Sequence, residues 1–92
     1  MKLLLIEDDE RLLAQLENKL TTAGFKVDSC LDGEEGLYRS REFKYDLAVI
    51  DLGLPKLSGL DVIKQLRSEN YTHPILILTA RSSWQDKVHG LN

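Results

Sequence analysis

The chain has 92 residues, which is enough for one domain and too few for two. Apolar residues make up 42% of the chain and charged residues 29%, a composition typical of a globular domain and not of a disordered or fibrous one. Twelve basic and fifteen acidic residues give a net charge of −3 and form no Lys/Arg block. We therefore expect no nucleic-acid binding by this chain alone.

The location of the protein is predicted from what its amino terminus contains. Uninterrupted apolar runs such as Leu3–Ile6 are four residues long, whereas a membrane-spanning helix needs about 20 apolar residues. The first of these runs leads directly into acidic residues, without the apolar stretch and cleavage site of a signal peptide. The single cysteine, Cys30, cannot form an internal disulfide and is expected to be a small buried apolar residue. We expect a cytoplasmic protein without a membrane segment.

The first half of the chain predicts two pairs of strand and helix. Lys2–Ile6 is an apolar run too short for a helix and typical of a strand buried on both faces. A helix is predicted next, because apolar residues recur at spacings of three and four before Gly24: Leu12, Leu13, Leu16, Leu20 and Ala23. Residues 25–30 indicate a second strand, and Asp32 is expected to cap a short helix that ends near Arg41.

The second half repeats the pattern. Leu47–Ile50 is a continuous apolar strand that ends in Asp51, and Ser58 with an acid three residues later predicts the start of a helix. Ile75–Leu78 is the fourth apolar strand, and Ser83 with Asp86 predicts a last helix start. Successive β–α units favour a parallel sheet with helices on both faces, so the predicted fold is an α/β three-layer sandwich.

Three aromatic residues flank the predicted strands, and we expect them to lie in the core: Phe25, Phe43 and Tyr45. His73 lies in a predicted loop and His89 near the end of the chain. Neither histidine has neighbours that indicate a ligand or a catalytic base, so both are expected to face solvent.

Acidic residues follow two of the predicted strands. Glu7 and Asp8 end the first strand and Asp51 ends the third. Ligands bind to open parallel sheets at the carboxyl ends of the strands, so these carboxylates are expected to converge if the two strands are neighbours. Three carboxylates together require a cation. An all-oxygen set suits Mg²⁺, which keeps other positions for water and phosphate oxygens.

A structural explanation competes for some of these acids. Acids at the start of a helix are stabilised by the helix dipole, and this accounts adequately for Asp9 and Glu10. It does not account for Asp51, which ends an apolar strand in front of a loop that contains glycine and proline. We therefore favour a functional role for Asp51.

A carboxylate at such a site can act as a nucleophile toward phosphorus and form an aspartyl-phosphate. The backbone carbonyl of Gly53 can complete the ligand set of the metal. Thr79 ends the fourth strand, so its hydroxyl can reach a phosphoryl oxygen if that strand lies beside the third. It can equally satisfy a loop amide.

These residues carry a resemblance to a known family. Three strings resemble the receiver domain of two-component response regulators, in order and at the family's spacing: Leu5-Ile6-Glu7-Asp8-Asp9, Val49-Ile50-Asp51-Leu52-Gly53-Leu54-Pro55 with Ser58-Gly59-Leu60, and Leu78-Thr79-Ala80-Arg81. Within the family the chain is similar to the winged-helix (OmpR/PhoB-type) branch. The stretch Ser83-Trp84-Gln85-Asp86-Lys87-Val88 most resembles PhoP-type regulators.

The resemblance implies a flavodoxin-like parallel sheet in the order 2-1-3-4. It also implies that Asp51 accepts phosphate from the phosphohistidine of a sensor histidine kinase, and that the chain catalyses only its own phosphorylation and dephosphorylation. Mg²⁺ would be held by Glu7, Asp8, Asp51 and the carbonyl of Gly53. Thr79 would move toward the phosphoryl group as the switch residue.

The chain also departs from the family pattern. Receivers have about five β–α units, with a lysine at the end of the fifth strand, and no lysine here matches that position: Lys2, Lys56 and Lys87 do not. We expect residues 1–92 to be a receiver domain that is incomplete at its carboxyl end and has no DNA-binding domain. An uncovered fourth strand predicts self-association, through that edge or through exchanged elements.

A phosphatase and a mononucleotide-binding protein are the two other functions that this fold suggests. A Mg²⁺-dependent phosphatase with an aspartate nucleophile needs a second acid two residues after the first, and here that residue is Gly53. A mononucleotide-binding protein of the same fold needs a glycine-rich loop after the first strand, where this chain has four acidic residues that would repel phosphate. The receiver remains the leading hypothesis, with the phosphatase as the alternative.

Overall fold

The computed structural model describes residues 1–78 of the chain, and the predicted helix start at Ser83 and Asp86 lies outside them. The elements in chain order are β1 (Lys2–Ile6), α1 (Glu10–Thr22), β2 (Lys26–Cys30), α2 (Gly33–Glu42), β3 (Leu47–Asp51), α3 (Gly59–Ser68) and β4 (Ile75–Leu78). Strands and helices alternate as the sequence predicts.

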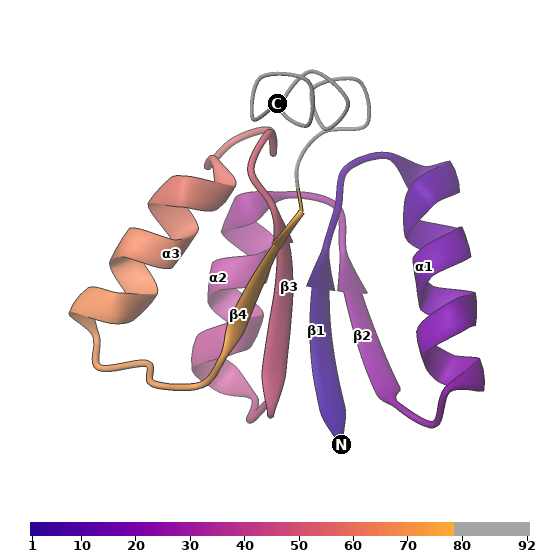
Figure 1. The fold of residues 1–92 in the computed structure, drawn as a ribbon. Coiled ribbons are helices and arrows are strands. Elements are labelled where there is room, and N and C mark those ends of the chain that lie inside the picture. The colour runs from indigo at the N-terminus through magenta and orange to yellow at the C-terminus, as the bar shows by residue number, and fades with distance from the viewer. Residues whose placement is uncertain (79–92) are drawn as a thin grey trace, which may run out of the picture.

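The strands form one parallel sheet in the order β2-β1-β3-β4, and their arrows all point the same way (Figure 1). The register brings their carboxyl ends level. Ile6 lies opposite Cys30 on one side and Ile50 on the other, and Asp51 lies opposite Leu78. The order 2-1-3-4 is the one that the resemblance implies.

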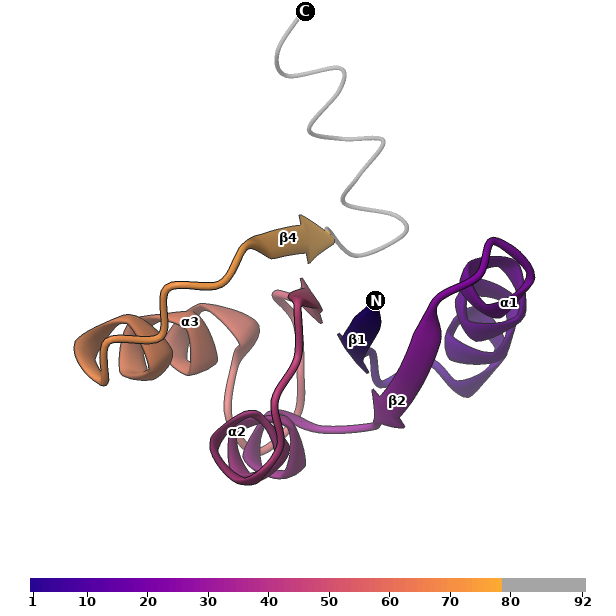
Figure 2. The same ribbon diagram turned by 90° about the horizontal axis from the view of Figure 1, so that it is seen from below.

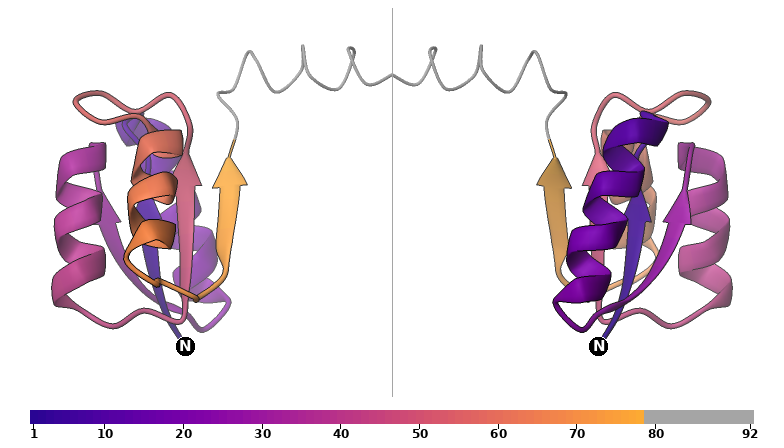
Figure 3. Two further views of the ribbon diagram at one scale, coloured as in Figure 1. Left: turned by 90° about the vertical axis from the view of Figure 1, so that its left-hand side faces the viewer. Right: turned by 90° about the vertical axis from the view of Figure 1, so that its right-hand side faces the viewer.

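Helices cover both faces of this sheet. Helix α1 lies on one face, and α2 and α3 lie on the other (Figure 2). The two side views of Figure 3 show the helices against the strands from opposite sides. The three-layer sandwich predicted from the alternation of elements is therefore confirmed over residues 1–78.

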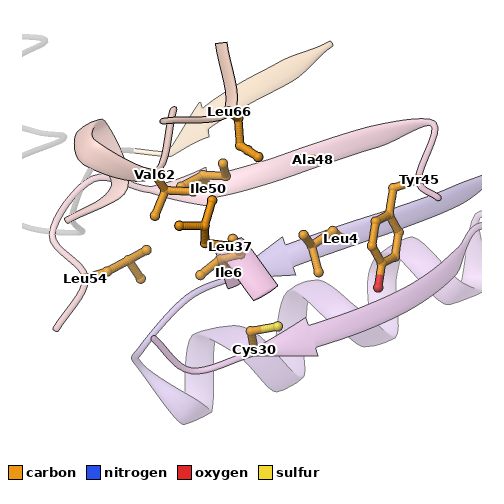
Figure 4. Packing of buried hydrophobic residues seen from close by; sticks show 10 residues of the cluster. All are labelled: Leu4, Ile6, Cys30, Leu37, Tyr45, Ala48, Ile50, Leu54, Val62 and Leu66. Carbon is orange, nitrogen blue, oxygen red and sulfur yellow. The ribbon is translucent and has the colours of Figure 1, made fainter. Parts of the chain in front are cut away.

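Two hydrophobic clusters lie on opposite faces of the sheet, and β1 contributes alternate residues to each. In β1, Leu4 and Ile6 belong to the cluster under α2 and α3, whereas Leu3 and Leu5 belong to the cluster under α1. Figure 4 shows the first cluster, in which side chains from the sheet meet those from α2 and α3. Because successive side chains of a strand point to opposite faces, a strand covered on both sides must be apolar throughout. This explains the unbroken apolar run.

Helix ends lie where short polar residues and glycine predict them. The Asp9, Asp32 and Ser58 side chains each accept a hydrogen bond from the backbone N–H three residues later, at 3.1, 2.8 and 3.2 Å. Each satisfies an amide that the first helical turn leaves unpaired. Gly24 follows α1 with φ 102°, a left-handed conformation that favours glycine.

One of the three aromatic predictions is wrong. Tyr45 is buried, and Phe25 packs against the core under α1, but Phe43 is 45% exposed. Phe43 follows α2 at the amino-terminal edge of the sheet, where its ring lies 5.7 Å from the ammonium of Lys2. A cation over an aromatic face is a favourable contact at the surface, so this ring needs no place in the core.

The structure bears out the environments expected for two other residues. Cys30 is 1% exposed, and His73 is exposed. None of the helices within residues 1–78 combines the length and the apolar character that crossing a membrane requires.

Candidate functional site

Three carboxylates converge at the carboxyl ends of two neighbouring strands. Glu7 and Asp8 directly follow β1, and Asp51 is the last residue of β3. Because β1 and β3 pair with Ile6 opposite Ile50, these acids reach the same edge of the sheet. One carboxylate oxygen from each of the three lies within 4.8 Å of the other two. The convergence expected from the sequence is therefore present.

The electrostatics of this cluster are unfavourable without a counter-charge. Glu7 and Asp51 are each 1% exposed, and Asp8 is exposed. Burial raises the pKa of Asp51, the backbone amide of Gly53 lowers it, and the charge of Asp8 raises it further. Buried like charges disfavour each other's ionised forms, so a bound cation would stabilise all three carboxylates at once.

The donor set fits a hard divalent cation. All three side chains offer oxygen ligands, which Mg²⁺ prefers. Within residues 1–78, the Oδ1 atom of Asp51 is buried and accepts no hydrogen bond. Buried carboxylate oxygens are normally paired, so this atom is available to a ligand that the protein does not itself supply.

The β1–α1 turn holds Glu7 and separates it from the acids that serve the helix. The backbone N–H of Glu7 donates to the carbonyl of Cys30 at 3.0 Å, and Oε2 of Glu7 accepts from the amide of Asp9 at 3.0 Å. Asp9 in turn caps α1, and Glu10 is in its first turn. The helix-start explanation therefore applies to Asp9 and Glu10, as the sequence suggested.

The loop after Asp51 is packed tightly at its far end. The amide of Gly59 donates to the carbonyl of Leu52 at 3.0 Å, and a Cβ on Gly59 would lie 2.0 Å from the backbone oxygen of Asp51. Gly53, two residues after Asp51, is exposed and has open space around its Cβ position. The first residue of α3 thus packs directly against the backbone of Asp51.

Strand β4 brings the chain toward Thr79. Leu78, the last residue of β4, lies opposite Asp51, and its carbonyl accepts from the amide of Leu52 at 3.2 Å. The strand that precedes Thr79 therefore lies beside β3. This neighbourhood is the condition, stated from the sequence, for the Thr79 hydroxyl to reach a phosphoryl oxygen. Thr79 itself lies outside the described residues.

Of the three lysines that do not match the family's lysine position, two pair with aspartate side chains. Lys2 is at the amino end of β1, where its ammonium lies 3.7 Å from Asp28. Lys56 pairs with Asp32 at 3.6 Å. Lys87 lies outside the described residues.

Sequence reasoning missed the contacts that fix the loop after Asp51. In the sequence, Gly59 is part of a family string and Asp32 is a helix cap, and neither indicates a contact with this loop. The one signal available was glycine at the first position of a helix, where it is a poor helix former. Which segment a glycine packs against depends on the tertiary fold, and the local sequence does not indicate it.

Comparison with known proteins identifies the family. Residues 3–92 match the response regulator receiver domain family. The chain is 57% identical over 91 residues to the two-component response regulator PhoP of Pseudomonas aeruginosa, covering 99% of this chain and 40% of that protein. It therefore spans less than half of that relative.

Two solved structures show the same fold. One is the response regulator TrrA of Thermotoga maritima in complex with Mg²⁺-BeF, with a TM-score of 0.83, 29% identity and coverage of 92% of this chain and 74% of that one. The other is a complex of the histidine kinase ThkA with TrrA, with a TM-score of 0.80, 30% identity and coverage of 90% and 78%. With the acidic cluster, the strand order and the family match in agreement, this chain belongs to the response regulator receiver domain family, and its similarity is to PhoP-type regulators.

Proposed function

We propose that residues 1–92 form a phospho-acceptor domain in which Asp51 takes a phosphoryl group from the phosphohistidine of a sensor histidine kinase. The observation that carries this proposal is the position of Asp51, buried at the end of β3 with Glu7 and Asp8 within 4.8 Å. An oxygen of Asp51 forms the bond to phosphorus as the bond from phosphorus to the histidine nitrogen breaks. The electron pair of that bond stays on the imidazole.

Glu7, Asp8, Asp51 and the backbone carbonyl of Gly53 would hold Mg²⁺. The ion would neutralise charge on the phosphoryl oxygens, which is the largest requirement of phosphoryl transfer. The three carboxylates and the buried Oδ1 of Asp51 support this ligand set. The solved complex of TrrA, a relative of the same fold, with Mg²⁺-BeF supports the choice of cation.

The relatives support the assignment of a partner and of an output. TrrA is seen bound to a histidine kinase, which supports a kinase as the phosphoryl donor here. This chain spans 40% of the Pseudomonas PhoP, and we assign DNA binding to a part of the regulator other than residues 1–92. The net charge of −3 supports that assignment. We assign the regulator to the cytoplasm, where a kinase can reach it.

Thr79 would act as the switch residue by contacting the phosphoryl group. The support is the register of β4, in which Leu78, the residue before Thr79 in the sequence, lies opposite Asp51. Thr79→Ser keeps the hydroxyl and Thr79→Ala removes it. If the hydroxyl matters, the alanine variant alone responds weakly to phosphorylation; equal responses would remove Thr79 from the switch.

Self-association through β4 is also proposed. Leu76 is 57% exposed and Ile77 49% exposed, on opposite faces of a strand that pairs only with β3 within residues 1–78. A bare strand edge with apolar side chains can pair with a second copy. Sedimentation at high micromolar concentration is expected to show dimers that Leu76→Lys weakens and Leu60→Lys, on α3, does not. A purely monomeric wild type would contradict this, and dimers unaffected by Leu76→Lys would favour exchanged elements.

One experiment separates the receiver from the phosphatase alternative, which the family match does not favour. The chain is mixed with excess p-nitrophenyl phosphate and Mg²⁺, and the release of nitrophenol is followed. A receiver is modified about once per molecule and consumes substrate slowly thereafter, whereas a phosphatase turns substrate over continuously. Sustained rapid turnover that Asp51→Asn abolishes would contradict the proposed function.

A further inference from the structure

An ion pair joins the start of α2 to the loop that follows Asp51. The ammonium of Lys56 lies 3.6 Å from Oδ2 of Asp32, while Oδ1 of Asp32 accepts from the amide of Glu35 at 2.8 Å. The side chain of Asp32 is 19% exposed and that of Lys56 is 61% exposed. The carboxylate of Asp32 therefore caps α2 through one oxygen and pairs with Lys56 through the other.

The ion pair holds a residue whose backbone has an unfavourable conformation. Lys56 has φ 66°, in the left-handed region that residues with a side chain rarely adopt. The amide of Leu57 donates to the carbonyl of Pro55 at 2.7 Å, which closes a three-residue turn around Lys56. A turn of this kind with positive φ at its centre is the rare, strained form of the γ-turn. Strained turns persist only where their surroundings hold them.

A second contact holds the same turn. The amide of Gly33 donates to the carbonyl of Pro55 at 3.4 Å, and a Cβ on Gly33 would lie 1.9 Å from the backbone oxygen of Leu57. The first residue of α2 thus lies directly against the loop, with no room for a side chain. On the other side, Leu54 is buried in the core. Residues 54–57 are fixed between α2 and the core.

This turn lies between the two ends of the Asp51 loop. Leu54 follows Gly53, and Gly59 packs against the backbone oxygen of Asp51. A shift of the turn therefore moves the carbonyl of Gly53 and the backbone of Asp51. We propose that Asp32 is a positioning residue: through Lys56 it holds the loop of residues 52–58 in the strained form that places Asp51 and Gly53 for Mg²⁺. This inference rests on the proposed function, because it assumes the metal site at Asp51.

The competing explanation is that Asp32 only caps α2. Asparagine is as good a helix cap as aspartate, so Asp32→Asn keeps the capping hydrogen bond and removes the charge, which faces Lys56 and the positive end of the α2 dipole. At Lys56 two variants separate charge from backbone strain. Lys56→Met loses the ammonium but keeps a side chain at positive φ, whereas Lys56→Gly loses the ammonium and also removes the strain, because glycine adopts positive φ freely.

The experiment measures Mg²⁺ binding to the 92-residue chain by calorimetry, with urea unfolding of each variant in parallel. Asp32→Asn and Lys56→Met are each expected to raise the dissociation constant by roughly two- to fivefold, the range that an exposed ion pair supplies. Their double variant should bind no more weakly than either single variant. Lys56→Gly is expected to bind nearly as well as the wild type. Lys44→Met, in the loop before β3 at the opposite end of the sheet, is the control for loss of one positive charge and should bind unchanged.

Three results would overturn the inference. In the first, Asp32→Asn and Lys56→Met bind Mg²⁺ like the wild type. In the second, Lys56→Gly loses as much affinity as Lys56→Met, which would assign the effect to charge and not to the turn. In the third, Asp32→Asn loses stability in urea without any change in Mg²⁺ binding. A wild type that binds no Mg²⁺ would refute the proposed metal site itself, and this outcome is distinct from the other three.

Discussion

Gly59 lies against the backbone oxygen of Asp51, so closely that a Cβ on Gly59 would come within 2.0 Å of it. The residue that starts α3 and the residue that ends β3 are therefore in direct contact, although a seven-residue loop separates them. The position of the Asp51 backbone depends on the absence of a side chain at Gly59.

Gly59→Ala is expected to destabilise the domain by about 1–3 kcal/mol, the range typical of forced overpacking. The backbone at Asp51 or the start of α3 must shift, because the clashing atom belongs to the main chain. Urea unfolding measures the loss. Gly53→Ala is the matched control for stability, since its Cβ would meet open space. Equal unfolding midpoints for the two variants would contradict the close contact.

Asp8→Asn is expected to weaken Mg²⁺ binding by roughly tenfold or more, because affinity at carboxylate sites depends on the number of ligand charges. Without Mg²⁺ the same variant should be as stable as the wild type or more stable, since it removes one of three neighbouring negative charges. Calorimetry and urea unfolding check both effects. Glu34→Gln, in the first turn of α2, is the control for loss of one acid. Unchanged Mg²⁺ affinity in Asp8→Asn would remove Asp8 from the site.

Cys30 is expected to resist thiol reagents in the folded protein. Burial raises the pKa of its thiol from 9.0 to about 12, so the reactive thiolate is scarce at neutral pH, and the side chain is 1% exposed. Reaction with an aromatic disulfide reagent should follow unfolding in urea. Rapid reaction in buffer alone would show that the end of β2 opens.

The same shift predicts a pH dependence of stability. The folded pKa of Cys30 lies above the unfolded value, so its contribution is fully present below pH 9.0 and is lost as the pH rises toward about 12. Over this range the free energy of unfolding should fall more for the wild type than for Cys30→Ala. The variant has no thiol to titrate, and it is less stable than the wild type at neutral pH. Parallel pH profiles for the two proteins would contradict this prediction.

Tyr45→Phe tests the polar contact at the amino-terminal end of the sheet. The Tyr45 ring is 2% exposed, and its hydroxyl donates to Oδ2 of Asp28 at 2.6 Å. Removal of the hydroxyl is expected to cost about 1–3 kcal/mol of unfolding free energy. Tyr38→Phe, at a ring that is 59% exposed, should change stability by less than about 0.5 kcal/mol. Equal effects of the two substitutions would show that the contact with Asp28 contributes nothing.

Much of the fold could be predicted because its signals are local. The unbroken apolar run of β1 indicates a strand buried on both faces, and Asp32, Ser58 and Gly24 mark helix ends by their own chemistry. The convergence of Glu7 with Asp51 was predictable too, since parallel strands present their carboxyl ends at one edge.

Other features could not be predicted because they depend on partners far away in the sequence. The exposed ring of Phe43 contacts Lys2, which is far from it in the sequence and at the other end of β1 from the acids. The positive φ of Lys56 depends on the start of α2, and no residue type at that position signals it. Asp32 looks like a cap from the sequence, and its second partner is visible only in the fold.

The central claim is that Asp51 accepts a phosphoryl group in a Mg²⁺-dependent reaction. The most direct test is the intact mass of the chain after incubation with a small phosphoryl donor, with and without Mg²⁺, for the wild type and for Asp51→Asn. One added phosphoryl group is expected on the wild type, only with Mg²⁺, and none on Asp51→Asn. The same added mass on Asp51→Asn, or a folded wild type that gains none, would contradict this claim.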